Sequence, residues 1–406
     1  MSLRGGAALL TVALLTGTGA GTASSGGTPG VTSSSILLGG TFPLSGPASA
    51  FGVVGASAAA YFKYVNAHGG VHHRRVTLKV LDDGYDPSRT VEETRRLVQQ
   101  DGVFAIFGSV GTEHALAVRP YLNHLKVPQL FVGTGSSDIA RNHKRYPWTM
   151  GYLPSFQGEG AIYGRYIVRK LPRARIGLLY EASPYGQDLL TGLQRGLGAH
   201  GRLIVAKQSY DVTETNVSAQ IARLKSSGAN TLMIVALPPF SIQAFIYAYK
   251  LGWRPHVFLS AVSVEPTVMS IARTNTHGQT TEGTISVAFL KDPTSPRWAR
   301  DPAVALYRRI LRKYDAGAKP TDVYNFYGMA VAFTMVDALR HAGRKLTRAD
   351  LLRAATHLNE RDNPFLIPGI PIKTRPNDYF PIAEAEMFRY HGALWRRLGP
   401  LVNARG

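Results

Sequence analysis

The sequence of 406 residues contains no cysteine. This absence excludes disulfides, thiolate metal sites, iron–sulfur clusters and cysteine nucleophiles, and it also excludes lipid attachment through an N-terminal cysteine. A hydrophobic content of 45% with 10% aromatic residues is ordinary for a globular protein, so wholesale disorder is excluded as well. At about 150 residues per domain, the length is sufficient for two or three domains.

Acidic residues are scarce beside basic ones, with 26 Asp and Glu against 46 Lys and Arg and a net charge of +20. Such an excess is found in nucleic-acid-binding proteins, but here the basic residues are scattered and no zinc-finger, helix-turn-helix or basic-zipper spacing accompanies them. We therefore expect no nucleic-acid partner. The charge fits a solvated basic face, and attraction to an anionic cell envelope stays open.

Long hydrophobic runs are also missing. The apolar stretch at residues 7–15 (AALLTVALL) is far shorter than the ~20 residues that span a bilayer. It follows Arg4 and precedes small residues, with Ala20 and Ala23 as candidate cleavage positions, which is the pattern of an export signal. We predict a signal peptide at 1–23, a flexible linker at 24–34 and an extracytoplasmic mature protein.

Recognisable catalytic motifs are absent from the sequence. We find no G-x-S-x-G elbow, no phosphate-binding loop and no H-E-x-x-H helix, and the twelve histidines show no metal-ligand spacing. The sequence therefore predicts no catalytic residue, no metal site and no cofactor, and the protein is not expected to be an enzyme.

Strands and helices alternate along most of the chain. The hydrophobic periodicity predicts strands at 35–41, 76–82, 103–107, 127–132, 176–180, 203–208, 232–236 and 257–259 and helices at 48–67, 88–100, 112–125, 184–197, 216–226 and 240–251. This alternation predicts an α/β protein in which helices cover both faces of parallel sheets. Breaks at 146–157 and 281–290 separate the series, a helix-rich stretch follows at 295–357, and the proline-rich tail from 363 is expected to be mostly loop with short edge strands.

Three loops at the carboxyl ends of predicted strands are rich in glycine and hydroxyl side chains. They contain Ser45 after the first strand, Gly111 and Thr112 after the third, and Gly133, Gly135 and Ser136 after the fourth. Ligands of open parallel sheets bind at these strand ends, and the helix that begins at Thr112 offers free N–H groups to a carboxylate. Thr112 has an alternative role as a helix cap. Three such loops at equivalent ends predict a shared pocket.

The sequence resembles the extracytoplasmic branched-chain amino-acid-type binding proteins of ABC importers, which have the type I periplasmic-binding-protein fold. The resemblance rests on the order of FPLSGP at 42–47, NAHGG at 66–70, LDD at 81–83, GSVGT at 108–112, VPQ at 127–129 and YGQ at 185–187. It implies two α/β lobes, each a parallel sheet flanked by helices, joined by three crossings. The expected lobes are 35–150 with 284–355 and 151–283 with 356–406.

The resemblance also implies roles for single residues. Thr112 matches the position that holds a ligand carboxylate, and Gly133 matches the carbonyl that accepts from a ligand ammonium. A hydroxyl of the family is replaced by Gly135 here, unless Thr134 or Ser136 supplies it. Aromatic wall positions match Phe51, Tyr185 and Tyr324.

The acid that pairs with the ligand ammonium in the resembled family is expected near residues 261–262, where the sequence has Ala261 and Val262, with Glu265 displaced. A buried ammonium without a carboxylate partner costs several kcal/mol, so the expected ligand widens from a branched-chain amino acid to a related small carboxylate, amide or aromatic acid.

The function expected from this resemblance is capture of a small solute and its delivery to an ABC transporter membrane permease, by a monomer. A sensory module that signals to a kinase or regulatory partner would have the same fold. A secreted hydrolase is a third class, for which no nucleophile–base set is found in the sequence.

Overall fold

The computed structural model describes Ser2 and residues 27–405 of the chain. The predicted signal peptide and the first residues of the predicted linker therefore lie almost wholly outside the described part. Within the remainder of the linker, Leu37 donates its N–H to the carbonyl of Gly30 at 2.8 Å, and Val31 forms a bridge with Ile36. This part of the predicted linker is folded against the first strand, because its backbone groups find partners there.

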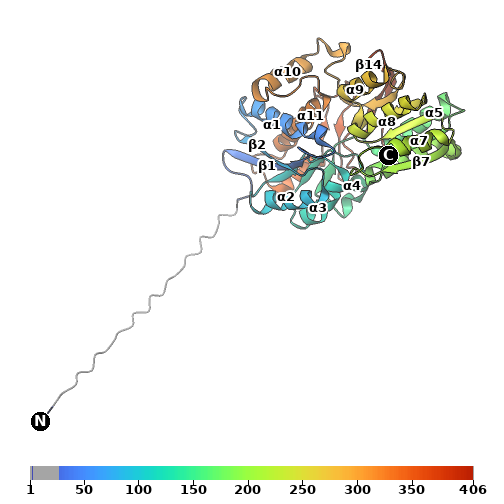
Figure 1. The fold of residues 1–406 in the computed structure, drawn as a ribbon. Coiled ribbons are helices and arrows are strands. Elements are labelled where there is room, and N and C mark those ends of the chain that lie inside the picture. The colour runs from blue at the N-terminus through green and yellow to red at the C-terminus, as the bar shows by residue number, and fades with distance from the viewer. Residues whose placement is uncertain (1, 3–26, 406) are drawn as a thin grey trace.

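Two sheets organise the chain, as the alternation predicts (Figure 1). The first has five parallel strands in the order β2-β1-β3-β4-β5, and the second has seven in the order β14-β13-β10-β9-β8-β6-β7. The strands are β1 (Ser35–Phe42), β2 (Arg75–Asp82), β3 (Ala105–Phe107), β4 (Gln129–Val132), β5 (Thr149–Gly151), β6 (Ile176–Glu181), β7 (Ile204–Tyr210), β8 (Thr231–Val235), β9 (His256–Leu259), β10 (Ile285–Ala288), β13 (Glu384–His391) and β14 (Leu394–Asn403), with a small separate pair, β11 (Asn359–Glu360) and β12 (Ile372–Lys373).

Helices cover both sheets. They are α1 (Val53–Asn66), α2 (Pro87–Gln99), α3 (Thr112–His124), α4 (Ser137–Arg141), α5 (Phe156–Lys170), α6 (Pro184–Leu197), α7 (Ser218–Ser226), α8 (Pro238–Lys250), α9 (Pro266–Thr276), α10 (Pro302–Tyr314), α11 (Val323–His341) and α12 (Arg348–Ala355). Local sequence sets several of the helix starts. Asp86, for example, accepts from the N–H groups of Ser88 and Arg89 and caps α2, whose first residue is proline.

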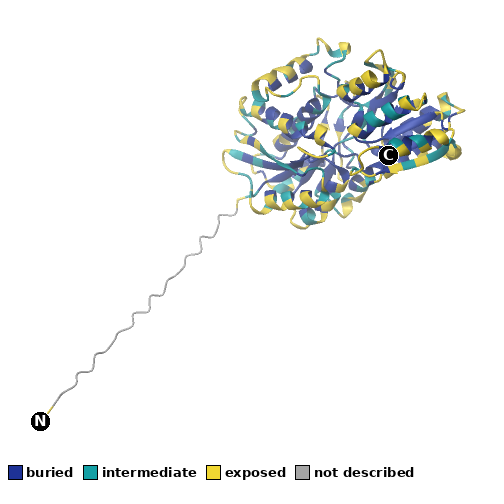
Figure 2. Cartoon of the chain, in the orientation of Figure 1, coloured by how far each residue is buried: buried dark blue, intermediate teal, exposed yellow. Residues whose placement is uncertain are grey.

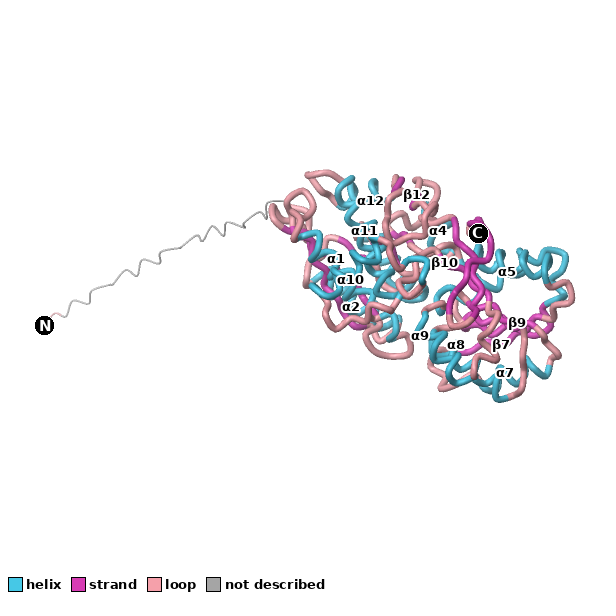
Figure 3. The backbone as a smooth tube through the Cα atoms, turned by 90° about the horizontal axis from the view of Figure 1, so that it is seen from above, coloured by secondary structure: helices cyan, strands magenta, loops and turns pink. Residues whose placement is uncertain are grey.

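The two sheets and their helices form two bodies side by side, and β10 lies where the bodies meet (Figure 3). One body carries α1, α2, α10, α11 and α12, and the other carries α5, α7 and α8. The chain crosses from one body to the other at three places, which lie after β5, after β10 and after β12. Figure 2 shows the central strands of both bodies buried, whereas the edge strands β2, β7 and β14 are mostly intermediate or exposed.

The last third of the chain departs from the prediction in two respects. The second sheet is mixed, because β13 and β14 run antiparallel to their neighbours, and the tail forms long strands at 384–403 where mostly loop is expected. Pro400 is tolerated because β14 is an edge strand. In addition, β10 pairs with β9 and β13, so residues 285–288 belong to the second sheet and not to the lobe that the sequence assigned them to.

Helices α5 and α6 approach one another through glycines. A Cβ atom on Gly192 of α6 would lie 2.1 Å from the carbonyl oxygen of Gln157, and one on Gly160 of α5 would lie 2.3 Å from that of Leu189. Contacts below 3 Å with backbone atoms leave no room for a side chain. The backbones of the two helices are therefore in direct contact. These are the first two helices of the second lobe.

Candidate ligand-binding site

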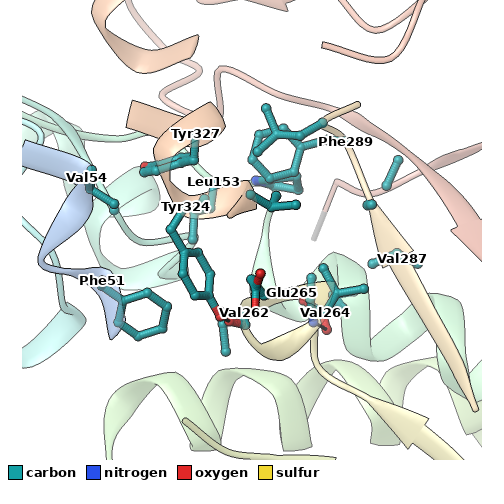
Figure 4. A pocket seen from close by; sticks show the side chains of 18 of the residues that line it. Phe51, Val54, Leu153, Val262, Val264, Glu265, Val287, Phe289, Tyr324 and Tyr327 are labelled. Carbon is teal, nitrogen blue, oxygen red and sulfur yellow. Dashed lines mark hydrogen bonds between the residues drawn. The ribbon is translucent and has the colours of Figure 1, made fainter. Parts of the chain in front are cut away.

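A cavity of about 150 Å³ lies where the two bodies face each other. Its walls come from the strand-end loops of the first sheet, from the starts of α5, α6 and α9, and from β10, α11, β13 and β14. Figure 4 shows Phe51 and Val54 on one side of this space and Val264 and Val287 on the other.

Most of the residues predicted for the site do line this cavity. The lining includes Phe51, Gly111, Thr112, Gly133, Tyr185 and Tyr324, whereas Ser45, Gly135 and Ser136 are not part of it. Chain segments separated by more than 200 residues are thus brought together as the strand-end argument and the resemblance predict. The roles of these residues in ligand binding stay predictions.

The three residues outside the lining are engaged elsewhere. Ser45 is exposed, and its hydroxyl donates to Asp82 Oδ2 at 2.7 Å. Gly135 is packed against the next crossing, because a Cβ there would lie 2.0 Å from the carbonyl oxygen of Pro154. Ser136 donates its N–H to Thr134 Oγ1 at 3.1 Å, and its own hydroxyl is buried.

Thr112 is the first residue of α3 and does not act as its cap. Gly111 holds the cap position with a φ of 111°, and no side-chain capping bond is formed there. The Thr112 hydroxyl instead lies 2.7 Å from Thr134 Oγ1. A helix start with free N–H groups beside two hydroxyls is a suitable partner for a carboxylate.

The aromatic walls are held by hydrogen bonds to the second body. Tyr324 of α11 packs edge-on against Phe51 with ring centroids 4.7 Å apart, and its hydroxyl donates to the carbonyl of Val262 at 2.8 Å. Tyr185 donates to Ser260 Oγ at 2.8 Å. In Figure 4, Tyr324 stands between Phe51 and Glu265. The Tyr324–Val262 bond therefore joins the two bodies across the cavity.

A second contact joins the bodies at residues that do not line the cavity. The N–H and Oγ of Ser137, at the start of α4, both donate to the carboxylate of Asp188 in α6 at 2.6 Å. The Gln157 amide donates to the same carboxylate at 2.8 Å. Together with the Tyr324–Val262 bond, these contacts join the two bodies to each other.

Sequence reasoning missed the acid beside residues 261–262. Glu159 of α5 is buried, lines the cavity and accepts from the Ala261 N–H at 2.8 Å and from the Tyr163 hydroxyl at 3.0 Å. The sequence has no acid at residues 261–262, and the fold brings a carboxylate to this point from a distant helix. Its pairing with a ligand ammonium stays a prediction. Burial raises the pKa of Glu159 to about 7. Its one sequence signal is a lone charge within the run FQGEGAIYG.

Two further acids line the cavity. Glu265 caps α9 by accepting from the Val268 N–H at 3.0 Å, and burial, with the nearby Asp322, raises its pKa to about 7. Burial also raises the pKa of Asp292. Among the lining residues that the structure describes, none is Lys, Arg or His. The charged side chains around the cavity therefore favour a cationic group of a ligand.

Within the described residues, no group of His, Asp or Glu side chains is arranged to hold a metal ion. The helices of that same part of the chain include none that is long and apolar enough to cross a membrane.

Comparisons with known proteins agree with this fold. A family described as "Periplasmic binding protein" matches residues 35–392. A Leu/Ile/Val-binding protein homolog 2 of Brucella abortus is 26% identical over 335 residues, which cover 82% of this chain and 84% of the relative. A homolog 1 of Brucella suis is 24% identical, covering 76% and 79%.

Two solved structures show how closely the fold is shared. A branched chain amino acid ABC transporter protein from Thermus thermophilus with bound valine has a TM-score of 0.80 at 18% identity, covering 92% of this chain and 97% of its own. A fatty acid ABC transporter substrate-binding protein from Thermomonospora curvata has a TM-score of 0.77 at 18% identity, covering 93% and 95%. At these identities the likeness concerns the fold alone.

Proposed function

This chain belongs to the periplasmic binding protein family, and from that premise we propose that it captures a small amino compound between its two lobes and delivers it to the membrane permease of an ABC importer. The observation that carries the proposal is the cavity lined from both lobes and closed by bonds that cross it. A ligand that contacts both walls stabilises the closed state, which is the state a permease would recognise.

The walls favour an amino acid with an apolar side chain. Its carboxylate would accept from the start of α3 at Gly111 and Thr112, and its ammonium would face the Gly133 carbonyl and Glu159. The side chain would lie against Phe51, Tyr185 and Tyr324. The names of the Leu/Ile/Val-binding relatives and of the valine-bound neighbour support this class of ligand. The name of the fatty acid transporter protein shows that the same fold also binds other solutes.

The position of Glu159 favours an amino acid over the other small carboxylates, amides and aromatic acids that the sequence allows. Those classes are allowed because residues 261–262 include no acid for the ammonium. An ionised Glu159 supplies the missing partner at the point where it bonds Ala261. A ligand with a carboxylate alone would bring a further acidic group beside Glu159, Glu265 and Asp292, with no ammonium to offset it.

The family implies a protein that works outside the cytoplasm and binds without turnover. Export by the predicted signal peptide would place it there. Delivery to a permease and action as a monomer are the remaining parts of the proposal.

Titration calorimetry tests the site with leucine, isoleucine and valine as probes. The double variant Thr112→Ala/Tyr185→Ala is expected to lower the affinity at least tenfold, because it removes a hydroxyl beside the carboxylate and an aromatic wall. Thr215→Ala, on an exposed loop, is the matched control and should bind as the wild type does.

Circular dichroism checks that both variants are folded. Unchanged affinity in a folded Thr112→Ala/Tyr185→Ala protein would contradict the placement of the ligand. A kinase or regulator that co-purifies with the ligand-loaded protein, in place of a permease, would favour the sensory alternative.

A further inference from the structure

The cavity does not end at the residues assigned to the amino-acid group of the ligand. Beyond Tyr324 it continues along the crossing that follows β10, where Val287, Phe289 and Leu290 form one wall. Phe388 of β13 and Trp395 of β14 form another. Figure 4 shows this direction, with Phe289, Val264 and Val287 on the side of Glu265 away from Phe51. We call this part the hinge-side passage.

The far end of the hinge-side passage is bordered by aromatic rings that are partly exposed, namely Trp298, Phe388 and Trp395. Deeper lining residues such as Val287 and Ala385 are buried. The passage therefore leads from the buried interior toward solvent. An apolar chain that enters it would meet mainly apolar surface, with the carboxyl groups of Glu265 and Asp292 among the other lining residues.

The rings at this end are fixed by bonds that do not involve a ligand. The Trp395 indole N–H donates to the Val264 carbonyl at 2.9 Å. The guanidinium carbon of Arg297 lies over the Trp298 ring, 4.4 Å from the centroid of that ring. Arg297 also forms an ion pair with Glu386. Side chains held in this way are preorganised around an apolar opening, because little rotamer freedom remains to be lost on binding.

Tyr327 borders the passage with its ring, which packs edge-on against Phe289 with centroids 6.4 Å apart. Its hydroxyl points the other way, toward Val54 in Figure 4, so the side of Tyr327 that faces the passage is apolar.

We propose that the hinge-side passage holds the apolar part of a ligand longer than leucine, so that the natural ligand is an amino compound with an extended acyl or aromatic side chain. This inference rests on the proposed function, since it uses the same head-group site. It adds that chain length, and not branching at the first carbons, determines affinity.

A series of unbranched α-amino acids, from norvaline through norleucine to 2-aminooctanoic acid, tests the proposal by calorimetry. Affinity is expected to rise about fourfold for each added methylene beyond norleucine, as each methylene leaves water for the passage. The matching alkanoic acids form a second series, which reports whether the ammonium is needed.

Two variants block the hinge-side passage. Ala288→Leu and Val264→Trp place bulk at lining positions and should abolish the gain for 2-aminooctanoic acid while leaving norvaline within twofold of its wild-type affinity. Ala299→Leu, at an exposed position outside the lining, is the control.

The outcomes separate the two proposals. Binding of norvaline with no gain along the series, or equal weakening of short and long probes by both blocking variants, would overturn the hinge-side passage alone. Absence of binding by every probe, short or long, would overturn the proposed amino-compound function together with it.

Discussion

Replacement of Glu159 by glutamine should raise stability and lower affinity at the same time. The Glu159 carboxyl is buried, and its pKa is raised from 4.5 to about 7 mainly by that burial. The folded protein therefore keeps this proton over a pH range in which the unfolded chain has released it. Consequently the free energy of unfolding falls as the pH rises from about 4.5 to about 7.

The size of this effect follows from the shift in pKa. At about 1.4 kcal/mol per pH unit, Glu159 removes about 3 kcal/mol of stability between pH 4 and pH 8. Glutamine has nearly the shape of the protonated side chain and does not titrate. Glu159→Gln is therefore expected to gain about 3 kcal/mol over wild type between those pH values.

Urea unfolding at a series of pH values measures this gain. Burial raises the pKa of Glu181 and Glu265 to about 7 and that of Glu360 to about 8, and it also raises the pKa of Asp292. Several carboxyls besides Glu159 therefore contribute to the wild-type slope, and the variant should lose one proton of that slope. Glu181→Gln is the matched control for ligand affinity, since Glu181 has a similarly raised pKa but does not line the cavity. Its stability should therefore change with pH as that of Glu159→Gln does. Parallel stability curves for wild type and Glu159→Gln would refute the reasoning.

The same variant should bind leucine at least tenfold more weakly at pH 8, because the ammonium loses an ionised partner. Wild-type affinity should fall as the pH drops below about 7, where Glu159 takes up its proton. Glu181→Gln should keep the wild-type affinity and pH profile. A Glu159→Gln protein that binds leucine as tightly as wild type at every pH would show that Glu159 does not face the ammonium.

Two further variants test closure and packing. Tyr324→Phe removes the bond to Val262 and should shift the lobes toward an open state by a few-fold, seen as a larger radius of gyration in X-ray scattering without ligand; an unchanged radius would contradict the role of this bond. Gly192→Ala should cost about 1–3 kcal/mol or more of stability, because its methyl group would meet the Gln157 carbonyl. Gly201→Ala, which would meet nothing within 4 Å, is its control, and equal melting temperatures for the two variants would contradict the close packing of α5 and α6.

Much of the first lobe could be predicted because its signals are local. The strands and helices from β1 to β4 follow hydrophobic periodicity, and Asp86-Pro87 marks the start of α2. Parallel strands end at one edge of a sheet, so Thr112 and Gly133 could be placed together from the sequence. The structure confirms this proximity.

The errors arise where a feature depends on distant parts of the chain. Prolines between 364 and 381 conceal the strands that follow them, and only pairing with β10 makes residues 384–391 part of a sheet. Glu159 lies about 100 residues from Ala261 in the sequence, and only the fold brings them to 2.8 Å. A lone glutamate among glycines carries no sign of that contact.

The direct backbone contact between α5 and α6 has a practical consequence for anyone who wishes to turn this binding protein into a biosensor. Helix α5 carries Glu159, and α6 carries Tyr185 and Asp188. The packed helix pair therefore positions both a wall of the site and the Ser137–Asp188 contact between the lobes. Redesign for a new analyte should therefore change side chains on β10 and α11, which face the same space. A fluorescent reporter is best attached to the outer faces of the lobes, where it leaves the helix pair undisturbed.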